Sequence, residues 1–231
     1  MTPVRVKICG ITRAGDAARA VALGADAVGF VFWPRSPRVV SAAAAHSIAS
    51  ALPAWVARVG VFVNATPDDV VQVVQQVGLD VVQLHGGEAV YDYSALAVRL
   101  IKAVTLDSDA DVERAAALPA HVTVLVDATD PVTHGGTGRA ADWSRAAALA
   151  RLRPIMLAGG LSAENAAAAV ETVRPWALDV SSGVESAPGI KSAEKMTRLF
   201  AVLMEAGALD SAKHQMEAGS LDPAARRGDL S

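Results

Sequence analysis

Short apolar runs alternate with alanine-rich helical runs along almost the whole chain. Short runs rich in β-branched residues are typical of strands, and longer runs with a period of 3.6 are typical of amphipathic helices. The pattern predicts eight strand–helix units. The strands are expected at residues 4–9, 27–32, 57–64, 81–85, 100–104, 122–127, 154–158 and 177–181. The helices are expected at residues 13–23, 42–52, 67–77, 90–97, 110–117, 163–173 and 191–204, with one more beginning at residue 142.

This alternation favours a closed parallel barrel over an open sheet. Two strand entries nearly repeat, GADAVGF from Gly24 and GLDVVQL from Gly78, as a repeated βα unit would. An open doubly wound sheet would place G-x-G-x-x-G after its first strand, whereas CGIT stands there and the glycines follow the last three strands. The sequence therefore predicts the α/β class: a single (β/α)8 TIM barrel, a parallel eight-stranded closed sheet with outer helices.

The end of the chain departs from this pattern. Residues 208–231 are polar and contain Gly219, Pro223 and Gly228, without a sustained apolar period. They predict a C-terminal tail, disordered or partly helical, after a barrel domain of residues 1–207. Truncation after Gly207 is expected to leave thermal stability nearly unchanged.

Strand parity selects the side chains that face the barrel lumen. In the first strand, apolar side chains occupy one face, while the other face holds two cations and the single cysteine. Apolar faces are assigned to the helices in every strand, so polar residues are expected in the lumen. The predicted lumen residues are Arg5, Lys7, Cys9, Arg58, Gly60, Phe62, Asn64, Gln83, His85, Asp127, Asp179 and Ser181, with Val59, Val61 and Val63 facing the helices. Neighbouring first and last strands would let Lys7 pair with Asp179.

Local signals also predict several helix starts. Thr66-Pro67-Asp68-Asp69 combines a capping hydroxyl, a first-turn proline and two acids that favour the helix dipole. Thr12, Ser41 and Ser162 are expected to cap the helices that follow them.

Candidate chemistry gathers at the carboxyl ends of the strands, where parallel barrels keep their active sites. Cys9 and Asp127 are expected at this rim, although a lone cysteine is often just a small buried residue. His85 is either a helper in the lumen or a core histidine. Arg38, in the loop WPRSPR, could clamp a carboxylate, with Arg35 as the competing choice.

Two glycine-rich segments follow strands seven and eight of the prediction. Gly159-Gly160 leads toward a helix, and Ser182-Gly183 follows the last strand. Such loops bind phosphate in many barrels through backbone N–H groups and the dipole of a short extra helix. The placement predicts a phosphate-binding site.

Composition and charge limit the kinds of partner that the protein can bind. The chain has 231 residues, a net charge of −3 and one cysteine. No basic run suggests nucleic acid, no apolar run suggests a membrane span or signal peptide, and no ligand set has metal spacing. We therefore expect a cytoplasmic protein, a monomer or a homodimer, without a bound metal ion.

The motifs, taken together, closely resemble the phosphoribosylanthranilate isomerase family from Val4 to Phe200. They are KICGIT at Lys7, GADAVGFVF at Gly24, VGVFVN at Val59, VQLHG at Val82, LVDA at Leu125, GGTG at Gly135, LAGGL at Leu157 and DVSSGVE at Asp179.

The resemblance implies a cofactor-free Amadori rearrangement in the biosynthesis of tryptophan, an aromatic amino acid. N-(5-phosphoribosyl)anthranilate would become 1-(2-carboxyphenylamino)-1-deoxyribulose 5-phosphate, an aldose–ketose isomerisation. Cys9 would be the general base, Asp127 the general acid and Arg38 the carboxylate-binding arginine. The phosphate would bind at Gly159, Gly160, Ser182 and Gly183, and His85 and Asp179 are also expected to contact substrate. The alternatives are another barrel isomerase or epimerase of sugar phosphates, or a non-catalytic phosphosugar-binding barrel.

Overall fold

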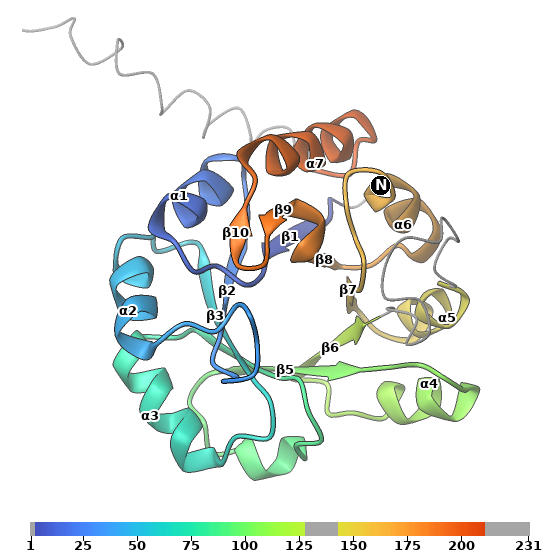
Figure 1. Ribbon diagram of the computed structural model, residues 1–231. Helices are drawn as coiled ribbons and strands as arrows, with labels where there is room; N and C mark the ends of the chain where they lie inside the picture. The colour runs from blue at the N-terminus through green and yellow to red at the C-terminus, as the bar shows by residue number, and fades with distance from the viewer. Residues whose placement is uncertain (1–2, 128–142, 211–231) are drawn as a thin grey trace, which may run out of the picture.

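Eight parallel strands close a barrel in the order of the sequence (Figure 1). A computed structural model describes residues 3–127 and 143–210 of the chain. The pairing of the first and last strands, with Arg5 opposite Ala177 and Ile8 opposite Val180, completes the ring and confirms the predicted fold class. The strands are β1 Arg5–Ile8, β2 Ala27–Val31, β3 Ala57–Phe62, β4 Val81–Leu84, β5 Arg99–Val104, β6 Val122–Asp127, β7 Ile155–Ala158 and β8 Ala177–Val180.

Helices surround this ring (Figure 1). The prediction of a full helix at residues 90–97 is wrong, because one 3-10 turn, η1 at Val90–Tyr93, stands there instead. A second short 3-10 turn, η2 at Ser182–Val184, follows β8. The α-helices are α1 Ala14–Ala22, α2 Ala42–Ser50, α3 Pro67–Val77, α4 Asp109–Ala116, α5 Ser144–Leu152, α6 Ala166–Val173 and α7 Ala193–Glu205.

The helix caps follow the local signals in part. Thr66 accepts a hydrogen bond from the Asp69 N–H at the start of α3, and Ser41 caps α2 in the same way, as predicted. Thr12 does not cap α1; its hydroxyl donates to the carbonyl of Gly189, a contact distant in sequence. Ser162 does not begin α6 either, since the segment first forms a turn and the helix starts at Ala166.

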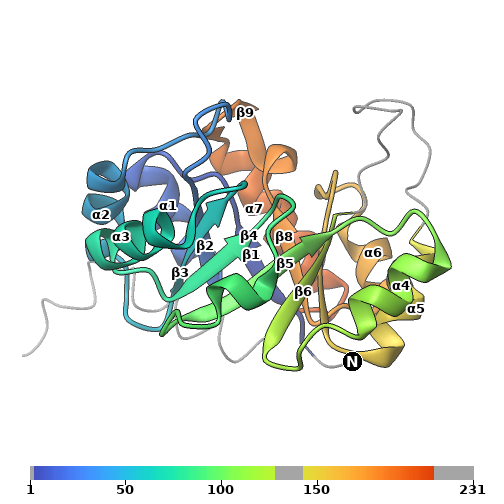
Figure 2. The same ribbon diagram turned by 90° about the horizontal axis from the view of Figure 1, so that it is seen from below.

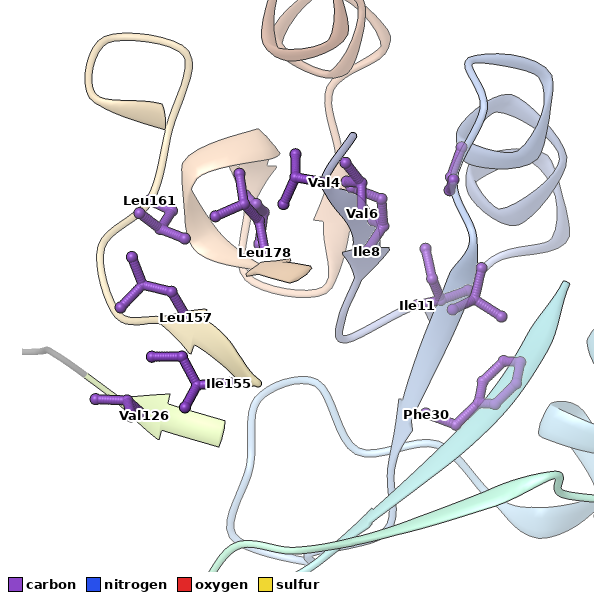
Figure 3. Close-up of a cluster of buried hydrophobic side chains, with 14 of the residues drawn as sticks. Val4, Val6, Ile8, Ile11, Phe30, Val126, Ile155, Leu157, Leu161 and Leu178 are labelled. Carbon is purple, nitrogen blue, oxygen red and sulfur yellow. The ribbon is translucent and has the colours of Figure 1, made fainter. Parts of the chain in front are cut away.

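An outer core fills the space between the strands and the helices. This core takes Val6 and Ile8 from β1 and Val4 directly before it, so the predicted parity of that strand is confirmed. Figure 3 shows these three side chains together with others of the same cluster. Lys7 lies on the opposite face of β1 and therefore points into the barrel.

Inside the barrel lies a second, smaller apolar cluster. Its fully buried members include Val59, Ile101, Leu125 and Met156. The predicted parity of β3 is therefore wrong, since Val59 faces the lumen and Phe62 belongs to the outer core. Both faces of a barrel strand are buried, so an apolar face need not point toward the helices.

A short hairpin follows η2 and was not predicted. Its strands, β9 Glu185–Ala187 and β10 Ile190–Lys191, pair antiparallel. Figure 2 shows β9 at the opposite end of the barrel from the N-terminus. The hairpin thus brings its side chains to the rim where the sequence places its candidate chemistry.

The barrel extends slightly beyond its predicted end. Ala208 and Leu209 are buried, and the carbonyl of Ala208 accepts a hydrogen bond from the N–H of Val4 at 2.7 Å. A boundary at residue 207 would remove these contacts, so it falls at least two residues short. Residues 211–231 lie outside the described part of the chain, as does the GGTG motif at Gly135. Among the described residues, none of the helices is both long and apolar enough to span a membrane.

Candidate active site

A cavity of about 470 Å³ opens at the carboxyl ends of the strands. It brings together most of the residues that the sequence selects, and they come from six separate segments. The predicted residues that line it are Cys9, Arg38, His85, Asp127, Gly159, Gly160, Asp179 and Ser182. Gly183 follows Ser182 directly and does not line the cavity itself.

Cys9 is held firmly at the wall of this cavity, directly after β1. Its N–H donates to the carbonyl of Val180 at 2.9 Å, and its carbonyl accepts from the Ser181 hydroxyl at 3.2 Å. The thiol packs with Val31 and Val61, and only 8% of the residue is exposed. The backbone therefore fixes the position of a thiol whose surroundings are partly apolar.

Lys7 places a charge deep inside the barrel, with 1% of its surface exposed. Its ammonium donates to Asp179 Oδ1 and to Gln83 Oε1, both at 2.9 Å. The pairing with Asp179 confirms the expectation from strand order. A buried ion pair contributes little net stability, because desolvation offsets most of its attraction. We therefore attribute Lys7 and Asp179 to the site rather than to the stability of the barrel.

Burial and charge act in opposite directions on the thiol. Burial is the largest influence and raises the pKa of Cys9 above its ordinary value, and the carboxylate of Asp179 adds to the rise. The charge of Lys7 lowers the pKa of Cys9, but by less. For Lys7 itself burial disfavours the ammonium, yet Asp179 and Cys9 together outweigh it and raise the pKa of Lys7. At neutral pH Lys7 is therefore charged and Cys9 is mainly the thiol.

A row of polar side chains crosses the lumen from Lys7 to Asp127. The amide nitrogen Nε2 of Gln83 lies 2.8 Å from His85 Nδ1. The other ring nitrogen, Nε2, lies 3.6 Å from Asp127 Oδ2. His85 is thus a residue of the cavity and not of the core, with about a third of its side chain exposed. Asp127 ends β6, which is separated from β1 and Cys9 by β7 and β8.

Arg38 reaches the cavity from the loop after β2, whereas Arg35 in the same loop is exposed and does not line it. Its Nε and Nη2 donate to the two carboxylate oxygens of Glu185 at 2.8 and 2.6 Å. Glu185 is buried in β9 and also accepts from Lys191 Nζ at 2.9 Å. These two cations hold the pKa of Glu185 below its usual range against the effect of burial. A fixed carboxylate therefore orients the guanidinium of Arg38.

Gly10 makes room for that arginine. The residue has a φ of 73°, and a Cβ atom there would lie 2.6 Å from Cδ of Arg38. Residues other than glycine rarely adopt this backbone conformation. The glycine of the CGIT motif thus lets the Arg38 side chain cross the end of β1.

The two glycine-rich segments meet at the rim. A Cβ atom on Gly183 would lie 1.9 Å from the carbonyl oxygen of Leu161, so only glycine lets the two backbones approach this closely. Gly159 and Gly160 do not enter α6 directly, because that helix begins only at Ala166. A short 3-10 turn, η2, begins at Ser182 beside these segments.

Sequence reasoning missed part of the site. Glu185 and Lys191 received no role, and Gln83 was placed in the lumen without one. The signal for Glu185 was a carboxylate at the end of DVSSGVE, a stretch otherwise of small and apolar residues after its aspartate. Within residues 3–127 and 143–210, no cluster of three His, Cys, Asp or Glu side chains could hold a metal ion; the absence of a cofactor stays a prediction.

Known proteins resemble the chain over most of its length. A family model described as N-(5'phosphoribosyl)anthranilate (PRA) isomerase matches residues 6–202. The N-(5'-phosphoribosyl)anthranilate isomerase of Acidithiobacillus ferrooxidans is 46% identical over 202 residues, which cover 87% of this chain and 98% of the relative.

Solved structures agree with the sequence relatives. Phosphoribosyl anthranilate isomerase from Thermotoga maritima has a TM-score of 0.81 and 42% identity, covering 87% of this chain and 99% of its own. A structure of such an isomerase in complex with reduced 1-(o-carboxyphenylamino)-1-deoxyribulose 5-phosphate has a TM-score of 0.78 and 41% identity, with the same coverage.

Proposed function

Because this chain belongs to the N-(5'-phosphoribosyl)anthranilate isomerase family, we propose that Cys9 and Asp127 are the general base and general acid of its reaction. The chain is an isomerase of tryptophan biosynthesis that converts N-(5-phosphoribosyl)anthranilate into 1-(2-carboxyphenylamino)-1-deoxyribulose 5-phosphate by an Amadori rearrangement. The observation that supports the two roles is that a thiol and a carboxyl face one cavity from β1 and β6, strands three positions apart round the barrel.

Asp127 acts first, in its protonated form. It donates its proton to the furanose ring oxygen as the bond from that oxygen to C1 breaks. The lone pair of the anthranilate nitrogen forms the C1=N iminium ion at the same time. A positioned acid of this kind typically contributes about 10²–10⁴ in rate.

Cys9 acts second, as the thiolate. The iminium ion makes the C2 proton acidic, and the sulfur takes it. The C–H electron pair becomes the C1=C2 bond, and the iminium electrons return to nitrogen, which gives an enolamine. The enolamine then tautomerises to the ketose, with loss of the C2 hydroxyl proton and protonation at C1. Lys7 offsets part of the cost of the thiolate beside it.

The two ends of the substrate bind at sites on either side of the reacting carbons. Arg38 binds the anthranilate carboxylate through the Nη1 side of its guanidinium, while Glu185 occupies Nε and Nη2. The phosphate binds where Gly159, Gly160 and Ser182 line the cavity. His85 and Asp179 contact the sugar between these ends. Fixing both ends places C2 between base and acid and lowers the entropic part of the barrier.

Replacement of Arg38 by alanine is expected to raise KM more than it lowers kcat. A carboxylate contact used equally in the ground and transition states changes binding rather than chemistry. A bidentate charged contact contributes roughly 1.5–3 kcal/mol, so KM should rise about tenfold to a hundredfold. Steady-state kinetics with Arg35→Ala as the matched control measures this. An unchanged KM in Arg38→Ala, with a raised KM in Arg35→Ala, would show that Arg35 and not Arg38 binds the carboxylate.

Loss of the fluorescence of phosphoribosylanthranilate on addition of the purified protein tests the activity itself. Turnover of a ribulose phosphate instead would favour another sugar-phosphate isomerase, and binding without turnover would favour a non-catalytic barrel. We also propose that the protein works in the cytoplasm, for which its single cysteine is the support. The choice between a monomer and a homodimer stays a prediction that light scattering can decide.

A further inference from the structure

Gln83 is a buried amide to which the proposed reaction assigns no role. Only 1% of its surface is exposed. Its oxygen Oε1 lies 2.9 Å from Lys7 Nζ, and its nitrogen Nε2 lies 2.8 Å from His85 Nδ1. Gln83 lies in β4 and His85 directly follows this strand, two positions further on, so both side chains point into the lumen. The amide therefore stands between a fixed cation and a histidine of the cavity.

Lys7 decides which way this amide points. An ammonium group has only donors, so its contact with Gln83 has to end on the carbonyl oxygen. Lys7 is itself fixed by its ion pair with Asp179 at 2.9 Å and by its burial. The NH2 group of Gln83 consequently faces His85.

The amide in turn decides which ring nitrogen of His85 holds the proton. An NH2 group only donates, so Nδ1 has to accept the hydrogen bond and cannot hold a proton in this arrangement. A proton on Nδ1 would set two N–H groups against each other over 2.8 Å and leave a buried donor unpaired. The imidazole proton is then on Nε2, which is 3.6 Å from Asp127 Oδ2.

We propose that Gln83 is a positioning residue that fixes His85 as the Nε2–H tautomer and thereby directs one N–H group at Asp127 Oδ2. The catalytic part of this inference rests on the proposed role of Asp127 as general acid. The gap of 3.6 Å is somewhat longer than a hydrogen bond, so a small movement of either side chain closes it. A donor at Oδ2 keeps the acidic proton off that oxygen and leaves it on Oδ1, the oxygen that then serves the sugar.

Nitrogen-15 NMR of the protein with labelled histidine tests the tautomer directly. The His85 signals are identified by comparison with the His85→Asn variant, and the pattern of long-range proton–nitrogen couplings separates Nδ1 from Nε2. The wild-type protein at pH 7 is expected to show a protonated Nε2 and an unprotonated Nδ1. A proton on Nδ1, alone or together with Nε2, would overturn the proposal without bearing on the role of Asp127.

Gln83→Glu replaces the hydrogen-bond donor that faces His85 Nδ1 by an acceptor. The new carboxylate still accepts from Lys7 but also accepts from His85, so a proton should appear on Nδ1. We expect kcat to fall about tenfold to a hundredfold, the range seen when the hydrogen-bond partner of a metal-bound histidine is lost. KM should stay within about twofold, because no substrate contact is removed. Gln76→Glu, on the exposed side of α3, makes the same charge change away from the site and should alter neither signal nor rate.

Gln83→Met provides a second variant with no donor and no added charge. It should give a mixture of the two tautomers and a smaller fall in kcat than Gln83→Glu. An unchanged kcat in a folded Gln83→Glu variant whose His85 has gained a proton on Nδ1 would contradict the positioning role. A normal kcat in Asp127→Asn would instead remove the proposed acid, while the tautomer assignment from the wild-type spectrum would stand.

Discussion

Cys9→Ala is expected to abolish turnover, with kcat lower by at least about 10²–10⁴, the contribution of a positioned base. Lys7 beside it cannot replace it as a base, because its pair with Asp179 holds it as a charged ammonium. KM should change little, because the thiol is not assigned to binding. Steady-state kinetics, with a melting curve to check the fold, measures the effect.

A serine at this position separates the chemistry of the thiol from its size. Cys9→Ser keeps a small polar side chain, but a hydroxyl is a far weaker acid and is not ionised at neutral pH. It should therefore be nearly as inactive as Cys9→Ala. Turnover close to the wild-type rate in either variant would remove Cys9 from the role of base.

Asp127→Asn is expected to lower kcat by about 10²–10⁴, because the amide has the shape of the acid without its acidic proton. KM should stay near its normal value if the carboxyl acts in the ring-opening step. Asp92→Asn, at an exposed position in η1, is the matched control and should behave as the wild type. If both variants turn over at the same rate, the proton for the ring oxygen comes from another group.

The sequence predicted the fold through the order of its strands and helices, and much of the site through strand parity. Parity predicted the inward-facing residues correctly where polar side chains alternate with apolar ones, as at Lys7, Gln83, Asp127 and Asp179. It failed for β3, where Val59 and Val61 face the lumen although valine would suit either side. Alternation alone does not say which of two buried faces points inward.

Contacts distant in sequence were beyond this reasoning. The bidentate pair of Arg38 and Glu185 joins residues 147 positions apart, and the hairpin that presents Glu185 has only two or three residues per strand. Short elements of this kind leave no periodic pattern. The same holds for Thr12, which resembles a helix cap locally but bonds to Gly189 instead. The balance between burial and charge at Cys9 likewise depends on packing, which composition does not reveal.

Alkylation of Cys9, compared with the activity that remains, tests the central claim most directly. The chain has one cysteine, so iodoacetamide reports on Cys9 alone. Burial raises the pKa of this thiol, so the alkylation rate should rise with pH, with a midpoint above ~8.5, the value of an ordinary thiol. Because the base has to be the thiolate, turnover should be lost in proportion to the fraction of Cys9 that is alkylated. Full turnover by the alkylated enzyme would contradict Cys9 as the base.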